Sequence, residues 1–180
     1  TVAFARSLGL EQSSYYFFAP DGPHWARLST EKENWIEIEM SDVQEIERGQ
    51  DYFFIDTGSP HYVRCEEKLD ALNIEKEGRR IRYNERFAAD GTNVNFVSAS
   101  PDLPLQVFTY ERGVEAETLS CGTGVTAAAI AYTLQHKRTQ GAAIKIPVET
   151  KGGPLEIRME QREGKYSKIW LCGPAKEVFQ

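Results

Sequence analysis

The sequence is poor in cysteine and histidine, with 3 of each among 180 residues. Cys65, Cys121 and Cys172 are an odd number without paired spacing, and no CxxC occurs. This argues against a disulfide framework and for a reducing compartment, which we expect to be the cytoplasm. Because zinc sites need closely spaced cysteine or histidine ligands, we expect no metal.

Long apolar runs are also missing, since no stretch approaches the roughly 20 residues that a membrane helix needs. Residues 1–10 carry no charged leader before a cleavage motif and do not resemble a signal peptide. The formal net charge of −6 at pH 7 disfavours nucleic acid as a partner. Neither a GxGxxG pattern nor a Walker-type phosphate loop is present. We therefore expect neither a membrane nor a nucleic acid as partner.

Short strands are the main structural feature that the sequence predicts. Hydrophobic residues make up 41% of the chain, enough to build one ordinary domain or two small ones. Apolar and charged residues alternate over 35–40, which is typical of a half-buried strand. Other apolar runs predict strands at 15–18, 24–28, 52–55, 62–63, 93–97, 105–110, 142–147, 155–159 and 168–171.

Few helices are expected beside these strands. The apolar spacing of Val2–Leu8 predicts the end of a helix that begins before the chain does, stopped at Gly9. A short helix is predicted over 69–72. The charged stretch 75–86 is expected to be exposed surface, and 41–50 to be a linker or the entrance to a second domain.

The rest of the chain is organised around residues 111–136, which run from charged residues through Ser-Cys-Gly-Thr-Gly into an alanine-rich helix. Ser120 is expected to cap this helix, which places Cys121 in the first turn. Unpaired N–H groups and the helix dipole favour an anion there, so the thiol pKa should be lowered. The same groups can bind a carboxylate. The alternative is a buried cysteine that merely starts a core helix.

Four other residues are candidates for chemistry. His61 ends a Gly-Ser-Pro-His corner between strands and would titrate near neutral pH, or only bond the turn backbone. Asn93 and Asn95 face the same side of a strand and suit recognition of an amino acid. The alternative is that Asn93 only caps the turn and that Asn95 is exposed. Arg112 can form a bidentate pair with a carboxylate or a surface ion pair.

Separated segments together resemble diaminopimelate epimerase, in the order of that family and over nearly the whole chain. They read YERGVEAETLSCGTGVTAAA, DTGSPHYV, GTNVNFV, VETKGGPLEI and LCGPAKEVF. The resemblance implies an α/β fold of the α+β type, with two pseudo-symmetric halves. Each half is a curved, mostly antiparallel sheet or barrel around a central helix. Residues 1–44, with 173–180 returning to them, would be the remainder of an incomplete N-terminal half, and 45–172 the C-terminal half.

The implied activity is the epimerisation of LL-diaminopimelate to meso-diaminopimelate, in lysine and peptidoglycan precursor synthesis. Two cysteines on opposite faces of one carbon move the proton, without pyridoxal phosphate, metal or another cofactor. The first cysteine is expected in a Cys-Gly-Asn-Gly segment, which the 180 residues lack, so the chain alone should be inactive. A homodimer is possible for this family. The alternatives are a related cofactor-independent racemase, a phenazine-type isomerase, or a non-catalytic binding module with the same fold.

The resemblance also assigns roles to individual residues. Cys121 matches the cysteine of the second half, and His61 and Glu111 match residues that tune the catalytic thiols. Asn93, Glu111 and Arg112 match residues at the substrate, a small dicarboxylic amino acid, with Arg112 holding its distal carboxylate. The backbone N–H groups of Gly122 and Thr123 would meet the reacting carboxylate, and Ser59 stands where some members have asparagine.

Overall fold

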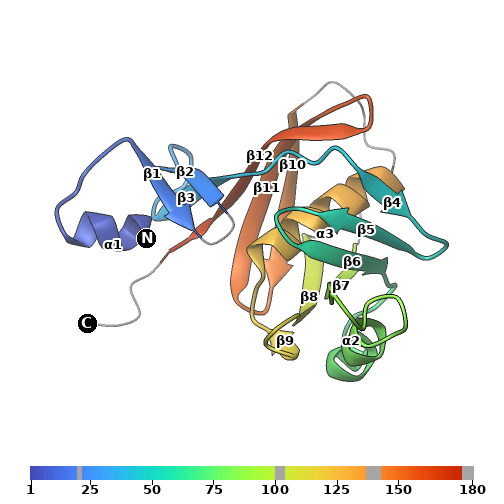
Figure 1. Cartoon of the computed structure of the whole chain (residues 1–180). Coiled ribbons are helices and arrows are strands. Elements are labelled where there is room, and N and C mark those ends of the chain that lie inside the picture. Colours follow the sequence, from blue (N-terminus) through green and yellow to red (C-terminus); the bar gives the residue numbers. More distant parts are fainter. Residues whose placement is uncertain (20–21, 100–103, 137–142, 176–180) are drawn as a thin grey trace.

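The computed structural model describes residues 1–19, 22–99, 104–136 and 143–175, and it is built mainly from strands (Figure 1). The helices are α1 (Val2–Ser7), α2 (Ile74–Arg82) and α3 (Gly122–Gln135). The strands are β1 (Ser14–Ala19), β2 (Gly22–Leu28), β3 (Trp35–Met40), β4 (Ile46–Arg48), β5 (Tyr52–Asp56), β6 (Pro60–Cys65), β7 (Asn93–Ser98), β8 (Leu105–Glu111), β9 (Ala116–Thr118), β10 (Ala143–Thr150), β11 (Gly153–Arg162) and β12 (Lys165–Pro174).

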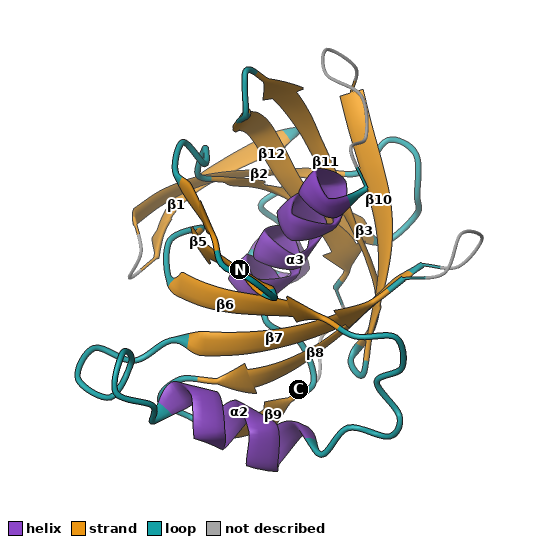
Figure 2. Cartoon of the chain, turned by 90° about the vertical axis from the view of Figure 1, so that its right-hand side faces the viewer, coloured by secondary structure: helices purple, strands orange, loops and turns teal. Residues whose placement is uncertain are grey.

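The described strands belong to one mixed sheet, in the order β1-β2-β3-β12-β11-β10-β8-β7-β6-β5-β4, with β9 paired to β8. Its pairs are antiparallel except β6 with β7 and β8 with β10. The part from β4 to β12 curves around α3, which lies within it (Figure 2). This mostly antiparallel sheet with few helices agrees with the predicted α+β class.

Helix α3 is apolar on all sides because strands surround it. Every side chain from Val125 to Ala131 is buried with 0% exposure. A helix that is hydrophobic all round belongs in a core. Four of these side chains are alanines, which let the surrounding strands approach the helix closely. The helix axis is thereby fixed, and with it the position of the first turn.

The N-terminal part of the chain extends from β12. Strand β3 pairs with β12, and β2 and β1 continue the sheet outward as an arm that carries α1 (Figure 1). Val2 of α1 packs with Tyr15 and Ala26 in a small separate core. Gly173 and Pro174 pair with Ile36 and Trp35 of β3, and 176–180 lie outside the described residues.

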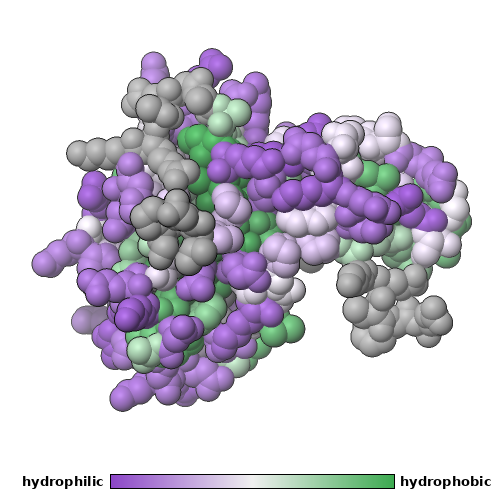
Figure 3. Space-filling model, turned by 180° about the vertical axis from the view of Figure 1, so that it is seen from behind, coloured by the Kyte–Doolittle hydropathy of each residue, from purple (hydrophilic) through white to green (hydrophobic). Residues whose placement is uncertain are grey.

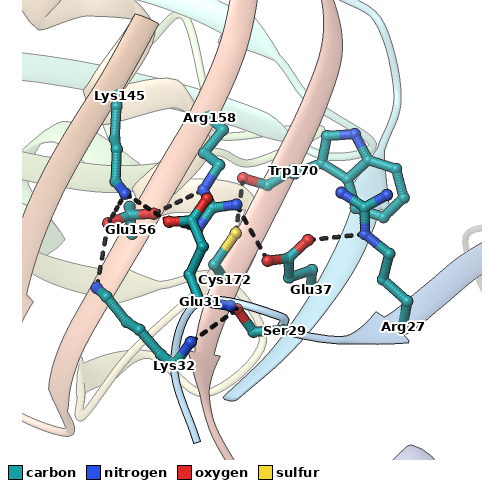
Figure 4. Close-up of polar contacts among 10 residues, drawn as sticks. All are labelled: Arg27, Ser29, Glu31, Lys32, Glu37, Lys145, Glu156, Arg158, Trp170 and Cys172. Carbon is teal, nitrogen blue, oxygen red and sulfur yellow. Dashed lines mark hydrogen bonds and ion pairs between the residues drawn. The ribbon is translucent and has the colours of Figure 1, made fainter.

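A cluster of charged side chains joins this arm to the rest of the sheet, and we call it the junction cluster (Figure 4). Glu37 of β3 and Glu156 of β11 are each 2% exposed. Glu37 accepts from Arg27 at 2.7 Å and from Arg158 at 3.1 Å. Glu156 accepts from Arg158 at 2.7 Å, so one guanidinium bridges both buried carboxylates.

The cluster also lowers the pKa of one of its buried carboxylates, Glu156. Lys32 and Lys145 complete the set around Glu156, with nitrogen–oxygen distances of 3.1 and 3.4 Å. Burial alone would raise the pKa of Glu156, but the hydrogen bonds from Arg158 and Lys32 outweigh burial, and the pKa lies below its usual value. The pairing of strands β3, β11 and β12 therefore rests on charged contacts as well as on the apolar core.

Most predicted elements are confirmed, including the strands, α1 and the central helix. The helix predicted over 69–72 is wrong, because these residues form a turn that positions Asn73 as the N-cap of α2. The stretch 75–86 is not only exposed surface, since most of it is α2, which buries Ile74 and Ile81. Residues 41–50 are not a plain linker, since they contain β4 and a bridge from Val43 to Tyr166.

The surface is largely hydrophilic. Seen from behind, polar residues cover most of the visible face, and hydrophobic patches remain where the arm meets the body and at its outer end (Figure 3). On the outer strands of the arm, Tyr16, Phe18 and Trp25 are 52%, 75% and 49% exposed. The outer strands of the arm therefore expose several large aromatic side chains.

Candidate active site

The site begins at the first residue of α3. Cys121 itself is the N-cap, with an extended backbone (φ −129°, ψ 112°), and its carbonyl accepts from Val125 N at 2.8 Å. The predicted cap at Ser120 is therefore wrong by one position. The helix begins at Gly122, which packs closely against β12, since a Cβ there would lie 2.7 Å from Leu171 Cδ2 and the leucine side chain would have to shift.

A pocket of about 400 Å³ opens at this helix start. One wall consists of Glu111, Ser120, Cys121, Gly122 and Thr123. The opposite wall comes from the arm and from β12, and it is formed by Phe17, Ala19, His24, Ile38, Met40 and Leu171. The pocket thus lies between a largely apolar wall and the polar end of a helix, which is an arrangement that suits a small polar ligand.

Burial raises the pKa of the Cys121 thiol above its usual value. The Thr123 hydroxyl and the N–H groups of Gly124 and Thr123 act in the opposite direction because they favour the anion, while the charge of Glu111 raises the pKa further. The prediction of a lowered pKa is therefore wrong for this structure. Desolvation outweighs the helix start, and Cys121 rests as a neutral thiol.

A continuous chain of hydrogen bonds leads from this thiol into the protein. Cys121 Sγ lies 3.4 Å from Thr123 Oγ1, and Thr123 Oγ1 lies 3.2 Å from Ser59 Oγ. Ser59 Oγ is 3.0 Å from His61 Nε2, and His61 Nδ1 is 2.8 Å from Asn95 Oδ1. The structure therefore brings together five residues from three separate segments of the sequence.

His61 lies inside the core and not at the surface of a corner. It has 0% exposure, and burial lowers its pKa to about 4, although Asn95 and the charge of Asp56 favour the protonated form. Arg112 adds to the lowering. The prediction that His61 titrates near neutral pH is wrong, because a buried imidazolium without a paired carboxylate is costly. The ring stays neutral at pH 7.

The other predicted ligands lie beside the pocket. Asn93 is 5% exposed, and its amide donates to Ser59 Oγ at 3.3 Å and to Pro60 O at 3.2 Å. Its Oδ1 accepts from Arg112 N at 2.9 Å. The Arg112 side chain is exposed and donates to Asp90 O at 2.9 Å, so its guanidinium does not line the pocket.

Sequence reasoning missed two residues that hold the site in place, Thr57 and Thr109. Thr57 is 2% exposed and its hydroxyl donates to Thr123 O at 2.9 Å, which anchors the first turn of α3. Thr109 accepts from Asn95 Nδ2 at 2.7 Å, and both are buried. The available signal was a threonine directly after one apolar strand and another inside the next but two, but β-branched residues are common in and near strands for other reasons.

Neither a metal cluster nor a membrane helix is found in the part of the chain that the structure describes. Over these residues, no three or more histidine, cysteine, aspartate or glutamate side chains are grouped to hold a metal ion. No described helix is both long enough and apolar enough to span a bilayer.

Comparisons with known proteins agree with this picture. The family model described as diaminopimelate epimerase matches residues 53–178. The chain is 38% identical to the diaminopimelate epimerase of Flavobacterium psychrophilum over 179 residues, which are 99% of this chain and 68% of that protein. It is 33% identical to the diaminopimelate epimerase of Chlorobaculum tepidum over 184 residues, covering 99% of this chain and 70% of that protein.

A solved structure shows the same fold at low identity. The Bacillus anthracis phenazine biosynthesis protein of the PhzF family matches with a TM-score of 0.74 and 12% identity, covering 97% of this chain and 70% of that one. At this identity the likeness concerns the fold alone. The chain spans about two thirds of the length of these relatives.

Proposed function

The chain belongs to the diaminopimelate epimerase family of isomerases, and on this premise we propose that the whole protein converts LL-diaminopimelate to meso-diaminopimelate. The observation that carries the proposal is the position of Cys121. Its sulfur stands at the N-terminus of α3 and at the edge of a pocket that also contains Glu111 and the first-turn amides. The reaction serves lysine and peptidoglycan precursor synthesis in this proposal.

The chemistry requires that a proton leave the α-carbon on one face and arrive on the other. The intermediate carbanion is far less stable than a thiolate, so its charge has to be spread into the α-carboxylate. The N–H groups of Gly122 and Thr123 at the start of α3 bind that carboxylate, and an oriented helix end in a closed pocket supplies several kcal/mol. No cofactor takes part in this proposal.

Cys121 supplies one of the two proton transfers. Because burial keeps its pKa raised, the resting thiol is suited to give its proton to the carbanion. In the reverse direction the same sulfur accepts the proton as a thiolate, as microscopic reversibility requires. Glu111 lines the pocket beside the sulfur, and its charge modulates the thiol.

The second proton-transfer group lies outside the 180 residues in this proposal. Cys65 and Cys172 are unsuited, because burial raises their pKa values to about 11 and about 12. No Cys-Gly-Asn-Gly segment occurs in the sequence. We therefore expect the 180-residue chain to bind diaminopimelate without epimerising it.

The distal end of the substrate is recognised by polar residues beside the pocket. Arg112 exchanges its contact with Asp90 O for a bidentate pair with the distal carboxylate. Asn93, which holds the Arg112 backbone, and Ser59 keep this side of the pocket polar. A substrate with one carboxylate and no distal charge would lose that pair.

The remaining proposals concern organisation. Residues 1–44, with 173–175, belong to the first of two pseudo-symmetric halves, and 45–172 form the second. Strand pairing of β3 with β12 supports the return of the chain end to the first half. The whole protein is cytoplasmic and forms a homodimer in this proposal.

The decisive experiment restores the missing part. The chain is joined to the segments of the Flavobacterium psychrophilum relative that it does not span, and epimerisation is followed by α-proton exchange in deuterium oxide. We expect activity in this chimera and none in its Cys121→Ala variant, with the fold of both checked by circular dichroism. Full activity of the Cys121→Ala chimera would refute the role of Cys121.

A substrate panel decides between the family's reaction and its alternatives. The chimera is offered diaminopimelate, proline and a phenazine precursor acid, each at the same concentration. Exchange with diaminopimelate only is the expected result. Exchange with another substrate would favour a related racemase or isomerase, and calorimetric binding without any exchange would favour a binding module.

A further inference from the structure

The chain of hydrogen bonds that ends at Cys121 has a direction, and Asn95 sets it. Asn95 Nδ2 donates to Thr109 Oγ1 at 2.7 Å, so the amide oxygen faces His61. A carboxamide oxygen can only accept a hydrogen bond. The nitrogen at 2.8 Å, His61 Nδ1, must therefore carry a hydrogen.

The position of this hydrogen determines the direction of each following hydrogen bond in turn. A neutral imidazole has one N–H group, so His61 Nε2 is an acceptor and takes the hydrogen of Ser59 Oγ at 3.0 Å. Ser59 then has no hydrogen left for Thr123, which must donate to it across 3.2 Å. Thr123 in turn accepts from the Cys121 thiol at 3.4 Å.

The opposite direction belongs to the anion. When Cys121 is a thiolate, Thr123 has to turn its hydrogen toward the sulfur, and Ser59 has to turn its own toward Thr123. His61 can then complete the chain only by offering a hydrogen at Nε2. Because Nδ1 already carries one, the reversed chain needs a second proton on His61.

The following inference rests on the proposed function of Cys121 as a proton-transfer group. We propose that Asn95 and Thr109 are positioning residues that hold His61 in its Nδ1–H form, and that they thereby couple the protonation of His61 to that of Cys121 through Ser59 and Thr123. In the coupled step the S–H bond of Cys121 breaks, one hydrogen shifts at each hydroxyl, and an N–H bond forms at His61 Nε2. A thiol and an imidazole become a thiolate and an imidazolium.

The surrounding packing keeps these residues in register. Gly124 lies directly against Asn95, and a Cβ on it would overlap Asn95 Nδ2. Thr57 fixes the Thr123 carbonyl from the other side at 2.9 Å. The charged groups that act on His61 are Asp56, which favours its protonation, and Arg112, which opposes it. Asn95 and Thr109 add no charge, so they determine where the hydrogen lies without creating an ion pair.

The tautomer can be read directly in the unmodified protein. The sequence has 3 histidines, so a long-range proton–nitrogen spectrum of the ¹⁵N-labelled 180-residue chain at pH 7 resolves each ring. We expect His61 with hydrogen on Nδ1 and none on Nε2. An Nε2–H form as the main species would overturn the proposal, and no substitution is needed to see it.

The coupling is tested by alkylation of Cys121, measured by peptide mass spectrometry at pH 7. Asn95→Asp places a carboxylate against His61 Nδ1, favours the imidazolium and so should reverse the chain toward the thiolate. The alkylation rate should rise at least about tenfold, which is one pKa unit of the thiol. Adding Ser59→Ala breaks the chain and should remove most of the rise.

Each result has one meaning. If the alkylation rate stays raised in the Asn95→Asp, Ser59→Ala double variant, the charge on His61 acts on the thiol directly through space, which contradicts the coupling. An unchanged alkylation rate in Asn95→Asp also contradicts it. Thr109→Val is the milder variant, and it should free the Asn95 amide to turn and populate the Nε2–H form. None of these measurements uses turnover. If the protein proves not to be an epimerase, these measurements still test the coupling of His61 to Cys121. If His61 proves to carry its hydrogen on Nε2, the proposed epimerase function is unaffected.

Discussion

One buried side chain, His61, should make this protein less stable in acid. Its pKa is about 4 in the folded chain, against an ordinary value of 6.5. The fold thus favours the neutral ring, so the contribution of His61 to stability is complete above pH 6.5. This contribution is lost as the pH falls from 6.5 toward 4, because His61 binds a proton in the unfolded chain but stays neutral in the folded one.

The size of the effect follows from the same two values. A difference of one pKa unit corresponds to about 1.4 kcal/mol. At pH 4.5 the unfolded histidine is almost fully charged and the folded one mostly neutral, which gives about 2.5 kcal/mol of lost unfolding free energy. That is a large share of the 5–15 kcal/mol typical of a domain.

The assay is urea denaturation of the 180-residue chain at several pH values between 8 and 4.5, followed by circular dichroism. His61→Gln removes the titrating group, so its stability should depend less on pH by about 2.5 kcal/mol over this range. His136→Gln is the matched control, because His136 is exposed, and its pH dependence should equal that of the unmodified chain. Carboxylates titrate alike in all three proteins and cancel in the comparison.

One result would refute this reasoning. If His61→Gln and the unmodified chain lose the same stability between pH 8 and 4.5, the ring is not kept neutral by burial. Burial would then give no reason for a neutral His61 ring at rest. The proton–nitrogen spectrum would still test which ring nitrogen carries the hydrogen.

Two further predictions concern packing and charge. Arg158→Met should lower the unfolding free energy by about 3 kcal/mol in urea denaturation, because Glu37 stays buried with one partner fewer. Lys168→Met, at an exposed pair, is the control and should change it by less than about 0.5 kcal/mol; equal losses would contradict the role of the junction cluster. Gly124→Ala should cost about 1–3 kcal/mol and displace Asn95, seen as a shifted Asn95 side-chain amide signal; an unmoved signal would argue against close packing there.

The sequence by itself determined the strands and the central helix of this protein. Alternation over 35–40 and the apolar run 125–134 are local patterns with the period of their elements, and both elements are present. It also singled out Cys121, His61 and Asn93, because turns and helix starts have local signals in glycine, proline and serine. The pattern of charges predicted α2 less well, because the few apolar residues of its buried face are separated by charged ones.

Only the tertiary structure decided the protonation states. The pKa of Cys121 is raised by burial, in a pocket that Phe17, Met40 and Leu171 line from other strands, and no spacing in the sequence reveals these neighbours. In the same way the hydrogen on His61 is placed by Asn95, 34 residues away, and by the partner of that amide. Periodicity is a property of neighbours along the chain, whereas desolvation and hydrogen-bond direction are properties of neighbours in space.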